Sequence, residues 1–489
     1  MGFMPSRWFS LVGLFWLCAY LYLAFKFHEF QSLPDVGLRQ TEGTHVLLPV
    51  VPAVVPASPG SGAGEGALLS QSGSPAHCAL RERAHARIFS QLTVAFPIIG
   101  TEPGSIYWKK DKHMGQRDKN FFAVERVYRA EWARQGVTVV DSLNATFIIS
   151  KQPQKWLELC KNYPNHQVIN HFGSMQKLTK KFMLARTMKN FVRTHKHRLH
   201  EIQRFVPLTF VLSDRMDCLE FGANVDRQAM WIAKDFFKHN AQGVRLLHEP
   251  EARELAASCL QHTAAERKTS SGDSTQVGRT LVQSYLQRPF LVQGRKCDFR
   301  VYLYIPVSEP LLAFYAPGWY MKCGHSQFNL TSRDVTNVVT NTKVKGKMRE
   351  GANYSELVWG PEQLQSYLSE QGFAADWVRT VFAEQLKKKL GLLMEALGPV
   401  KGTGYELLGC DLMLDEDLNV WLMEVNNSPE MSASLGGRKA AVEGILRAVV
   451  GTQIDLMHFA ASGKPREDLS LTDLPSVGEL ELVYQAPAR

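Results

Sequence analysis

The chain has 489 residues, of which 45% are hydrophobic and 21% are charged, which is the composition of an ordinary globular protein. This length accommodates about two to four domain-sized units, and lobes that share one active site can form a single enzyme. The eight cysteines form no CxxC pair and have no histidine at zinc-ligand spacing, so they do not indicate a structural zinc site. We expect free or buried thiols, which leave the redox compartment undecided.

The N-terminal region contains a long apolar run. Residues 9–25, FSLVGLFWLCAYLYLAF, carry no charged side chain and lie between Arg7 and Lys26, at the short end of the length that spans a bilayer. Bulky aromatic residues continue to the end of the run, where a cleaved signal peptide has small residues, so residues 1–30 are predicted to be an uncleaved anchor. Arg7 and Lys26 nearly balance, which leaves the orientation open. Residues 31–77 are rich in proline, glycine, serine and alanine, which is typical of a flexible stalk.

Order resumes near residue 78. Runs of β-branched and apolar residues predict strands over 137–140, 146–149, 168–170, 229–233, 281–285, 299–305 and 311–315. Apolar periodicity and composition predict helices over 176–198, 361–396 and 436–461. The polar segments 253–278 and 323–355 are predicted to be loops, and the tail after residue 463 is polar. Because strands and helices are mixed without strict β-α-β alternation, the sequence favours an α+β enzyme.

A hairpin carries the strongest chemical signal. Residues 405–429, YELLGCDLMLDEDLNVWLMEVNNSP, predict two antiparallel strands joined by a turn at 415–417. Glu424 and Asn426 share one face of their strand, and pairing across the turn can bring Asp411 alongside them. Two carboxylates and an amide oxygen suit Mg²⁺. In the alternative, Asp411 caps a turn and Glu424 forms a surface ion pair, but charges inside an apolar strand are costly unless they are paired or bind metal.

Lysine and arginine side chains mark further candidates. Lys296, Asp298 and Arg300 alternate along one strand, so they share a face on which phosphate oxygens could be held, with a solvent-facing ladder of ion pairs as the alternative. Lys234 ends an apolar strand and Lys181 lies in a basic helix. Either lysine could contact phosphate or a nucleobase, and either alone could simply be solvated.

The segment 176–200 carries eight basic residues and no acid. The basic residues are Lys177, Lys180, Lys181, Arg186, Lys189, Arg193, Lys196 and Arg198. Such a run is most often a solvated helix face. The alternative is a docking surface for an acidic partner, either nucleic acid or an acidic protein tail.

Several of these motifs, in this order, resemble the tubulin–tyrosine ligase-like family of ATP-grasp ligases, which add amino acids to proteins, chiefly to tubulin tails. The resemblance runs from about residue 165 to 435. The matching blocks are INHF with LTKKFMLARTMKNF, FVPLTF, WIAK, LVQSYLQRPFLVQGRKCDFRVYLYI, the TN of DVTN, and the hairpin. The first block and RKCDFR resemble the polyglutamylase side of the family.

The resemblance implies ATP and Mg²⁺ as cofactors and assigns residues to them. The implied metal ligands are Asp411, Glu424 and Asn426. The implied nucleotide and phosphate contacts are Lys181, Lys234, Lys296, Asp298 and Arg300. Thr336 and Asn337 match a pair near the amino-acid substrate. Arg300 and Lys322 would be the catalytic cations, although the family usually has an arginine at position 322.

The chain departs from the family pattern around the lysine strand. Asp235 stands where the family has proline, and only Gly243 remains of the glycine- and arginine-rich phosphate loop. Asp334 replaces a histidine, and Lys322 keeps a charge but loses the bidentate geometry of arginine. The metal triad is intact, so nucleotide binding is better supported than efficient catalysis.

The implied organisation is an ATP-grasp-like, multi-lobed α+β enzyme behind a membrane anchor. Its parts are the anchor 1–30, the stalk 31–77, an N-terminal α/β lobe 78–175, a central ATP-grasp lobe 176–285, a C-terminal ATP-grasp lobe with the metal site 286–462, and a tail 463–489.

The implied reaction joins an amino acid, with glutamate favoured, to an acidic protein acceptor such as a tubulin tail through an acyl phosphate. The alternatives are a nucleotide-binding pseudoenzyme and a lumenal ligase acting on another acceptor. We expect a single-pass membrane protein held by residues 9–25, with a cytosolic catalytic domain and no nucleic-acid partner. Asn-X-Ser/Thr triplets at Asn144, Asn329 and Asn353 are compatible with the lumenal alternative, but such triplets often arise by chance.

Overall fold

A computed structural model describes most of the region that follows the predicted stalk. The described residues are 93–95, 98–99, 106–107, 116–140, 145–150, 168–236, 238, 243–265, 277–331, 357–402, 404–431, 436–464 and 468–487. They all belong to the unit Ala67–Arg489. The predicted anchor and stalk lie outside them, so both stay predictions. None of the helices in these ranges is both long enough and apolar enough to cross a membrane.

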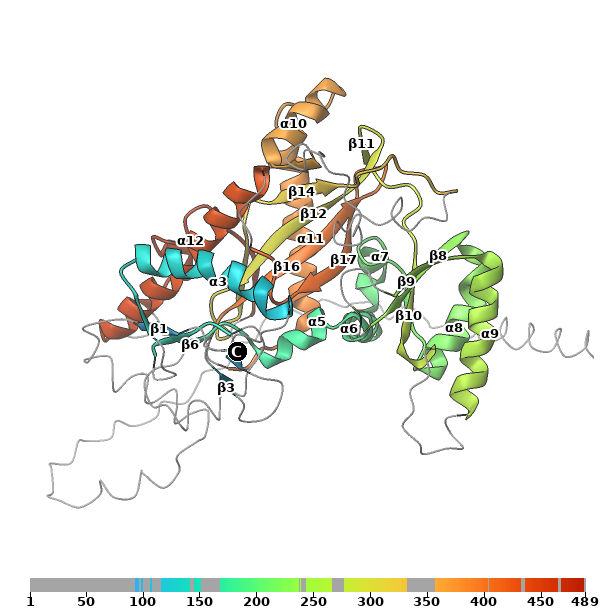
Figure 1. Ribbon diagram of the computed structural model, residues 1–489, viewed down its shortest axis with the longest axis horizontal. Coiled ribbons are helices and arrows are strands. Elements are labelled where there is room, and N and C mark those ends of the chain that lie inside the picture. The colour runs from blue at the N-terminus through green and yellow to red at the C-terminus, as the bar shows by residue number, and fades with distance from the viewer. Residues whose placement is uncertain are drawn as a thin grey trace, which may run out of the picture. The chain divides into compact units, whose positions relative to one another are not determined.

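The largest sheet has eight strands and is built around the long strand β12 (Figure 1). Each strand pairs antiparallel with its neighbours, and all of the strands come from the C-terminal half of the chain. The strands are β11 (Leu291–Val292), β12 (Arg295–Ile305), β13 (Leu312–Tyr315), β14 (Tyr320–Cys323), β15 (Val358–Trp359), β16 (Glu406–Leu414), β17 (Val420–Asn426) and β18 (Glu481–Gln485).

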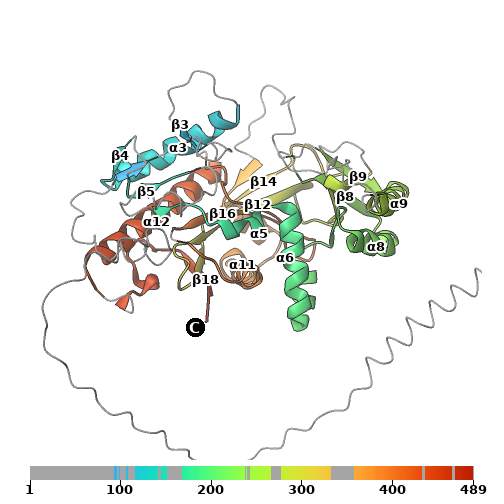
Figure 2. The same ribbon diagram turned by 90° about the horizontal axis from the view of Figure 1, so that it is seen from below.

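The two faces of β12 pack against different helices. Phe299, Val301 and Leu303 point to one face and join a buried apolar cluster with helix α11 (Ala383–Leu397), which Figure 2 shows beneath β12 and β16. On the opposite face, Tyr302 and Tyr304 are covered by helix α12 (Gly436–Ala461). The N-terminal half of that second face carries polar side chains and belongs to the site described below.

A second sheet has the order β7-β10-β8-β9 and is antiparallel throughout. Its strands are β7 (Thr209–Val211), β8 (Met230–Asp235), β9 (Val244–His248) and β10 (Thr280–Ser284). One face packs on helices α8 (Arg215–Asn224) and α9 (Glu249–Ala265) through Phe210, Phe221 and Trp231. The polar side chains of Lys234 and Gln283 therefore lie on the other face.

The N-terminal sheet is parallel, with the order β4-β1-β5-β6, and a separate small hairpin pairs β2 with β3. The elements are β1 (Thr93–Ala95), β2 (Ile98–Ile99), β3 (Ile106–Tyr107), helix α3 (Gln116–Arg134), β4 (Thr138–Val140), β5 (Phe147–Ile148) and β6 (Val168–Ile169). A buried polar contact ties this sheet to the large one. His171 Nδ1 lies 2.7 Å from Glu406 Oε1, and the backbone N–H of Phe172 donates to the other oxygen of Glu406 at 2.9 Å.

The basic segment is a series of short helices rather than one helix. The pieces are α5 (Gln176–Thr179), α6 (Lys181–Thr194), the 3-10 turn η3 (Lys196–Arg198) and α7 (Leu199–Gln203). Lys180 is extended, which ends α5 and starts α6 at Lys181. The prediction of a continuous helix over 176–198 is therefore wrong at Lys180 and His195, although Leu184, Met188 and Phe191 form the buried side as expected.

The mixed α+β architecture is confirmed, and several elements lie where they were predicted. Helix α12 spans 436–461, and the hairpin that was predicted to carry metal ligands is β16 and β17. The predicted helices over 361–396 are α10 (Pro361–Glu370), the π-helical turn η9 (Val378–Phe382) and α11. The loop predicted over 253–278 is wrong in its first part, because α9 continues to residue 265. The polar tail, for which no element was predicted, supplies strand β18 at the edge of the large sheet.

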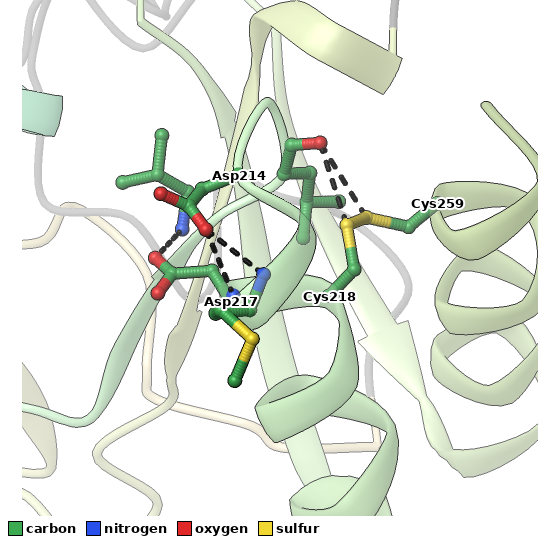
Figure 3. The surroundings of a disulfide bond; sticks show 7 residues. Asp214, Asp217, Cys218 and Cys259 are labelled. Atoms are coloured by element: carbon green, nitrogen blue, oxygen red, sulfur yellow. Dashed lines mark hydrogen bonds between the residues drawn. A yellow bond between two sulfur atoms is a disulfide. The ribbon is translucent and has the colours of Figure 1, made fainter. Parts of the chain in front are cut away.

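The cysteine prediction is also wrong for four of the five described cysteines. Cys218 is bonded to Cys259 between α8 and α9, as Figure 3 shows, and Cys297 is bonded to Cys323 between β12 and β14. Cys410 alone is a free, buried thiol among the described cysteines. The partners are 41 and 26 residues apart in sequence, so no local spacing motif announced either bond.

Candidate active site

Four neighbouring strands of the large sheet place polar side chains on one shared face. In the registers of β14, β12, β16 and β17, Asp298 is opposite Lys322, Arg300 is opposite Asp411, and Asp411 is opposite Glu424. Side chains two apart on a strand point to the same side, so Asn426 joins this face. The sheet therefore brings together residues that lie more than a hundred positions apart in sequence.

Arg300 and Asp411 form the centre of this face. Arg300 donates from Nε to Asp411 Oδ1 at 2.7 Å and from Nη2 to Oδ2 at 3.2 Å, a bidentate pairing. Burial opposes ionisation of Asp411, but Arg300 and Lys322 outweigh it and hold the pKa of its carboxyl below the usual value. A Cβ at Gly409 would lie 3.1 Å from Cδ of Arg300, so glycine leaves room for the guanidinium.

Asp298 and Lys322 form a second pair beside it. Lys322 Nζ lies 2.8 Å from Asp298 Oδ2. Burial works against the charge on Lys322, but Asp298 and Asp411 outweigh it and raise the lysine pKa. Asp298 Oδ1 is buried and has no hydrogen-bond partner among the described residues. A buried carboxylate oxygen without a partner is costly, which marks Asp298 as a position for a ligand hydroxyl or cation.

Two lysines, Lys296 which is buried and Lys234 which is half-buried, donate hydrogen bonds to neutral side chains. Lys296 donates to the hydroxyl of Tyr285 at 2.9 Å, and Lys234 donates to Gln283 Oε1 at 2.7 Å. Burial lowers the pKa of Lys296 to about 7, Asp298 partly opposes this, and Lys234 adds to it. Burial likewise lowers the pKa of Lys234 to about 8. Burial therefore disfavours the charged form of both lysines, and a phosphate group beside them would favour it.

A pocket lies between the second sheet and the hairpin of β16 and β17. Its lining residues include Lys181 and Leu184 from α6, Lys234 and Gln283 from the second sheet, and Leu422 and Glu424 from β17. Lys181 Nζ lies 3.6 Å from Glu424 Oε1, so this contact links α6 to the polar face of the large sheet. The pocket combines apolar walls with two lysines, a glutamine and a glutamate, a mixture that ligand-binding sites commonly show.

The hairpin residues fit a magnesium ion by the chemistry of their donors. Asn426 Nδ2 donates to Asp411 Oδ2 at 3.3 Å, so these two side chains are oriented together, opposite Glu424. Carboxylate and amide oxygens are hard ligands. Across the described ranges, no group of three or more His, Cys, Asp and Glu side chains could hold a metal ion. The candidate set instead consists of two carboxylates and one amide.

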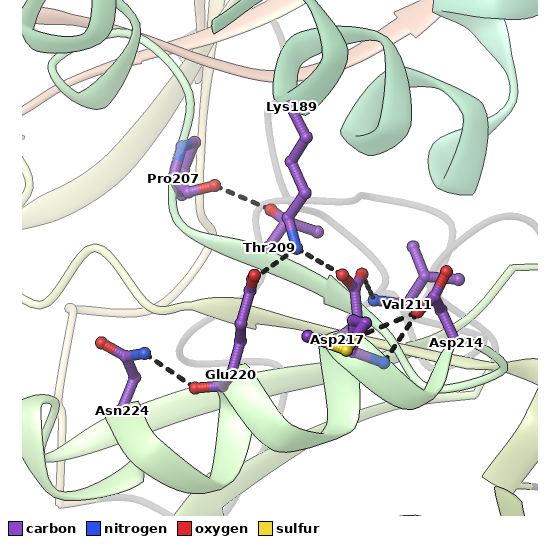
Figure 4. A network of polar contacts seen from close by, with 9 residues as sticks. Lys189, Pro207, Thr209, Val211, Asp214, Asp217, Glu220 and Asn224 are labelled. Carbon is purple, nitrogen blue, oxygen red and sulfur yellow. Dashed lines mark hydrogen bonds and ion pairs between the residues drawn. The ribbon is translucent and has the colours of Figure 1, made fainter. Parts of the chain in front are cut away.

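The basic segment is partly neutralised. Lys189 lies 2.5 Å from Asp217 and 3.1 Å from Glu220, both on α8, as Figure 4 shows. Arg198 contacts Glu201 and Glu395. Lys189 is thus not available as a free docking charge, contrary to the expectation that included it. Arg186, Arg193 and Lys196 are exposed.

The structure brings most of the predicted site residues together and leaves two outside. The predicted residues that line the pocket or the adjoining face of the sheet are Lys181, Lys234, Lys296, Asp298, Arg300, Lys322, Asp411, Glu424 and Asn426. Thr336 and Asn337 lie outside the described residues. Gln283 and Tyr285 were missed as site residues. The glutamine inside the apolar run TLVQSYL could have indicated this position, because a polar side chain on a buried strand is costly unless it forms a hydrogen bond.

The profile of the tubulin-tyrosine ligase family matches residues 158–459, which is more than half of the chain. The chain belongs to the tubulin-tyrosine ligase family. All the sheet residues of the site fall inside the matched segment, so the resemblance stated from the motifs is confirmed.

Individual relatives are distant. Protein polyglycylase TTLL10 of Mus musculus is 26% identical over 325 residues, which cover 60% of this chain and 45% of that protein. Inactive polyglycylase TTLL10 of Homo sapiens is 28% identical over 280 residues, covering 55% and 41%. Tubulin monoglutamylase TTLL4 of Homo sapiens is 25% identical over 319 residues, covering 59% and 24%. The chain thus spans less than half the length of these relatives.

Proposed function

We propose that this chain is an ATP-dependent carboxylate–amine ligase that joins an amino acid to a carboxylate of an acidic protein. The observation that carries the proposal is the shared face of β12, β14, β16 and β17, where the bidentate Arg300–Asp411 pair lies beside Glu424, Asn426 and the buried lysines. In this arrangement, carboxylates that could bind a metal ion lie next to lysine and arginine side chains that could bind phosphate. Phosphoryl transfer requires both.

Each group has a role in this proposal. Asp411, Glu424 and Asn426 would hold Mg²⁺, which would neutralise phosphate charge when bound. Lys181, Lys234 and Lys296 would contact the nucleotide. Arg300 and Lys322 would stabilise charge that develops on the transferred phosphoryl group.

The reaction has two steps. An acceptor carboxylate attacks the terminal phosphorus of ATP, which gives an acyl phosphate and ADP. The amino group of the incoming amino acid then attacks the acyl carbon, which forms an amide and releases phosphate and one proton. No covalent enzyme nucleophile is needed, so positioning and electrostatics are the contribution of the protein.

Glutamate and glycine are the two candidate amino acids. The RKCDFR run, residues 295–300, resembles the polyglutamylase side of the family and favours glutamate, whereas the TTLL10 relatives are named polyglycylases. A tubulin tail is the first acceptor to test, because relatives are named for tubulin.

A nucleotide-binding pseudoenzyme is the second candidate. It is favoured by Asp235, which stands in place of the family proline and lies 3.7 Å from Arg279 in an ion pair. The name of the human TTLL10 relative describes an inactive protein. Nucleotide binding without amino-acid transfer would select this candidate.

The test is to incubate the domain from residue 78 with ATP, magnesium, tubulin or an acidic peptide, and one amino acid at a time. Mass spectrometry of the acceptor is expected to show mass additions of glutamate or glycine that require ATP. Nucleotide binding with no addition of any amino acid to either acceptor would overturn the ligase assignment and favour the pseudoenzyme.

A further inference from the structure

Two disulfide bonds lie in separate parts of the fold. Cys218 and Cys259 join α8 to α9 on the second sheet, and the sulfur of each lies 3.5 Å from the carbonyl oxygen of Leu212 (Figure 3). Cys297 and Cys323 are directly opposite in the register of β12 and β14. All four cysteines are buried. The two bonds are independent, because they link different pairs of elements in different sheets.

Disulfides of this kind are typical of one class of compartment. The cytosol keeps thiols reduced, and stable structural disulfides in cytosolic proteins are rare, whereas the secretory pathway forms and preserves them. Cys410 on β16 is paired with Val301 in the sheet register and has no cysteine opposite it, so it stays a thiol. The bonds therefore form where the fold aligns two cysteines and not at every buried cysteine.

A second, separate observation is the Asn329-Leu330-Thr331 triplet. Asn329 is exposed, and its side-chain oxygen accepts hydrogen bonds from the backbone N–H of Thr331 at 2.9 Å and from its hydroxyl at 2.8 Å. The preceding residue, Phe328, is anchored by a hydrogen bond from its N–H to Gly294 O at 2.9 Å. The triplet is thus a surface turn on a fixed base, the setting in which N-glycosylation acceptors lie.

The triplet Asn426-Asn427-Ser428 differs from the one at Asn329, because its asparagine lies inside a strand. Asn426 lies on β17, its amide nitrogen donates to Asp411, and Pro429 follows the triplet. This asparagine takes part in the sheet and in the contact with its carboxylate neighbour, so of the two triplets whose asparagine the structure describes, only the one at Asn329 is exposed in a surface turn.

We propose that the catalytic domain of this chain resides in an oxidising compartment of the secretory pathway, where Cys218–Cys259 and Cys297–Cys323 form and Asn329 accepts an N-linked glycan. Each disulfide forms when two thiols pass two electrons and two protons to a thiol–disulfide oxidant. In glycosylation, Nδ2 of Asn329 attacks the anomeric carbon of a lipid-diphosphate-linked oligosaccharide, loses a proton and displaces the lipid diphosphate.

The inference is independent of the ligase proposal, and it changes the expected acceptor. An enzyme in this compartment would meet acidic secretory or cell-surface proteins rather than cytosolic tubulin. It runs against the expectation of a cytosolic catalytic domain, which was stated from a sequence whose cysteine pattern left the redox compartment undecided. The predicted anchor would then place residues 1–8 on the cytosolic side.

The glycan is tested with the full-length chain expressed in animal cells. Peptide N-glycosidase treatment in heavy-oxygen water is expected to convert Asn329 to labelled aspartate, which mass spectrometry detects. Asn329→Gln and Thr331→Ala should each abolish glycosylation at this site, so that the chain migrates faster on a gel by the mass of one glycan. The matched control Thr331→Ser keeps the triplet and should migrate like the wild type. Unlabelled Asn329 in the wild-type chain, with no mobility change in either variant, would overturn this site.

The disulfides are tested in the same cells. Lysis in denaturant with one alkylating reagent, followed by reduction and a second reagent, should place the second label on Cys218, Cys259, Cys297 and Cys323 and the first label on Cys410. The first label on all five would overturn the oxidising compartment. Neither readout needs catalysis, so an inactive ligase would leave this inference intact.

Discussion

Burial lowers the pKa of Lys296 and of Lys234, and this has a consequence for the pH dependence of stability. The pKa of Lys296 is lowered to about 7, compared with about 10.4 in an unfolded chain. Between these values the unfolded chain binds a proton that the folded protein has released, so this group adds stability as pH rises from about 7 to about 10. Below about pH 7 the cost of burying the charge is fully present.

Nucleotide binding should therefore take up protons. A phosphate beside Lys296 favours its charged form, so at pH 8 binding of ATP is expected to take up close to one proton at this residue, with a further fraction at Lys234. Calorimetry in buffers of different ionisation enthalpy measures the uptake. Lys296→Met should reduce it by most of one proton.

The matched control is Lys389→Met. Burial lowers the pKa of Lys389 to about 8 as well, but this lysine lies on α11 and donates to Arg204 O at 2.8 Å, away from the residues that line the pocket. Its substitution should leave the proton uptake unchanged. Equal uptake by wild type and Lys296→Met would show that Lys296 does not meet the phosphates.

At the scale of elements, the exposed part of the basic segment is the candidate docking surface for an acidic acceptor. Lys189 and Arg198 contact carboxylates. The side chains of Arg193 at the end of α6 and Lys196 in η3 are exposed on the same segment. Attraction to a disordered acidic tail would be mostly electrostatic and sensitive to salt. Reversing both to glutamate is expected to raise the acceptor KM several-fold at low salt and to leave ATP affinity nearly unchanged.

The comparison is made at two salt concentrations with a control of equal charge change. Arg379→Glu with Lys439→Glu alters exposed residues on η9 and α12, and it should shift the acceptor KM much less. The effect of the Arg193 and Lys196 reversal should shrink at high salt. A wild-type KM for that variant at low salt would identify the segment as a solvated face.

The same scale shows what the sequence could and could not predict. The hairpin of β16 and β17 was predictable, because charges at Asp411 and Glu424 interrupt apolar strands and the turn residues separate them. Helix α9 was missed because its sequence is polar and weakly patterned, and it is stabilised by packing on the second sheet. Strand β14, which carries Lys322, is four residues long, too short for a periodic signal.

The partners of the site residues could not be predicted, since they depend on register across the sheet. Alternation placed Lys296, Asp298 and Arg300 on one face, but only the pairing of β12 with both β14 and β16 assigns Asp298 to Lys322 and Arg300 to Asp411. The disulfides depend on the same long-range alignment. Sequence motifs therefore predicted candidate residues, and the register of the sheet determined which of them contact one another.

At the scale of the whole molecule, the apolar run at residues 9–25 predicts membrane attachment. The full-length chain should stay with membranes through carbonate extraction and enter the detergent phase. Removal of residues 1–30 should yield a protein that remains in the aqueous phase. Full-length chain in the aqueous phase would exclude the anchor.

The pocket unites three parts of the chain: helix α6, the second sheet and the hairpin of the large sheet. The proposed function therefore depends on whether the hairpin carboxylates bind Mg-ATP. Glu424 is partly exposed and lies opposite Asp411, so replacing it with glutamine removes a charge without opening a cavity. Glu416→Gln, in the exposed turn of the same hairpin, is the matched control.

The decisive measurement is Mg-ATP-dependent ligation by Glu424→Gln, together with its thermal melting. We expect turnover to fall by about 100-fold or more, as for loss of an electrostatic group at a reacting centre, while the melting temperature stays within about 2 °C of wild type. Glu416→Gln should keep wild-type turnover. Wild-type turnover by Glu424→Gln with normal melting would contradict the metal role and with it the proposed site.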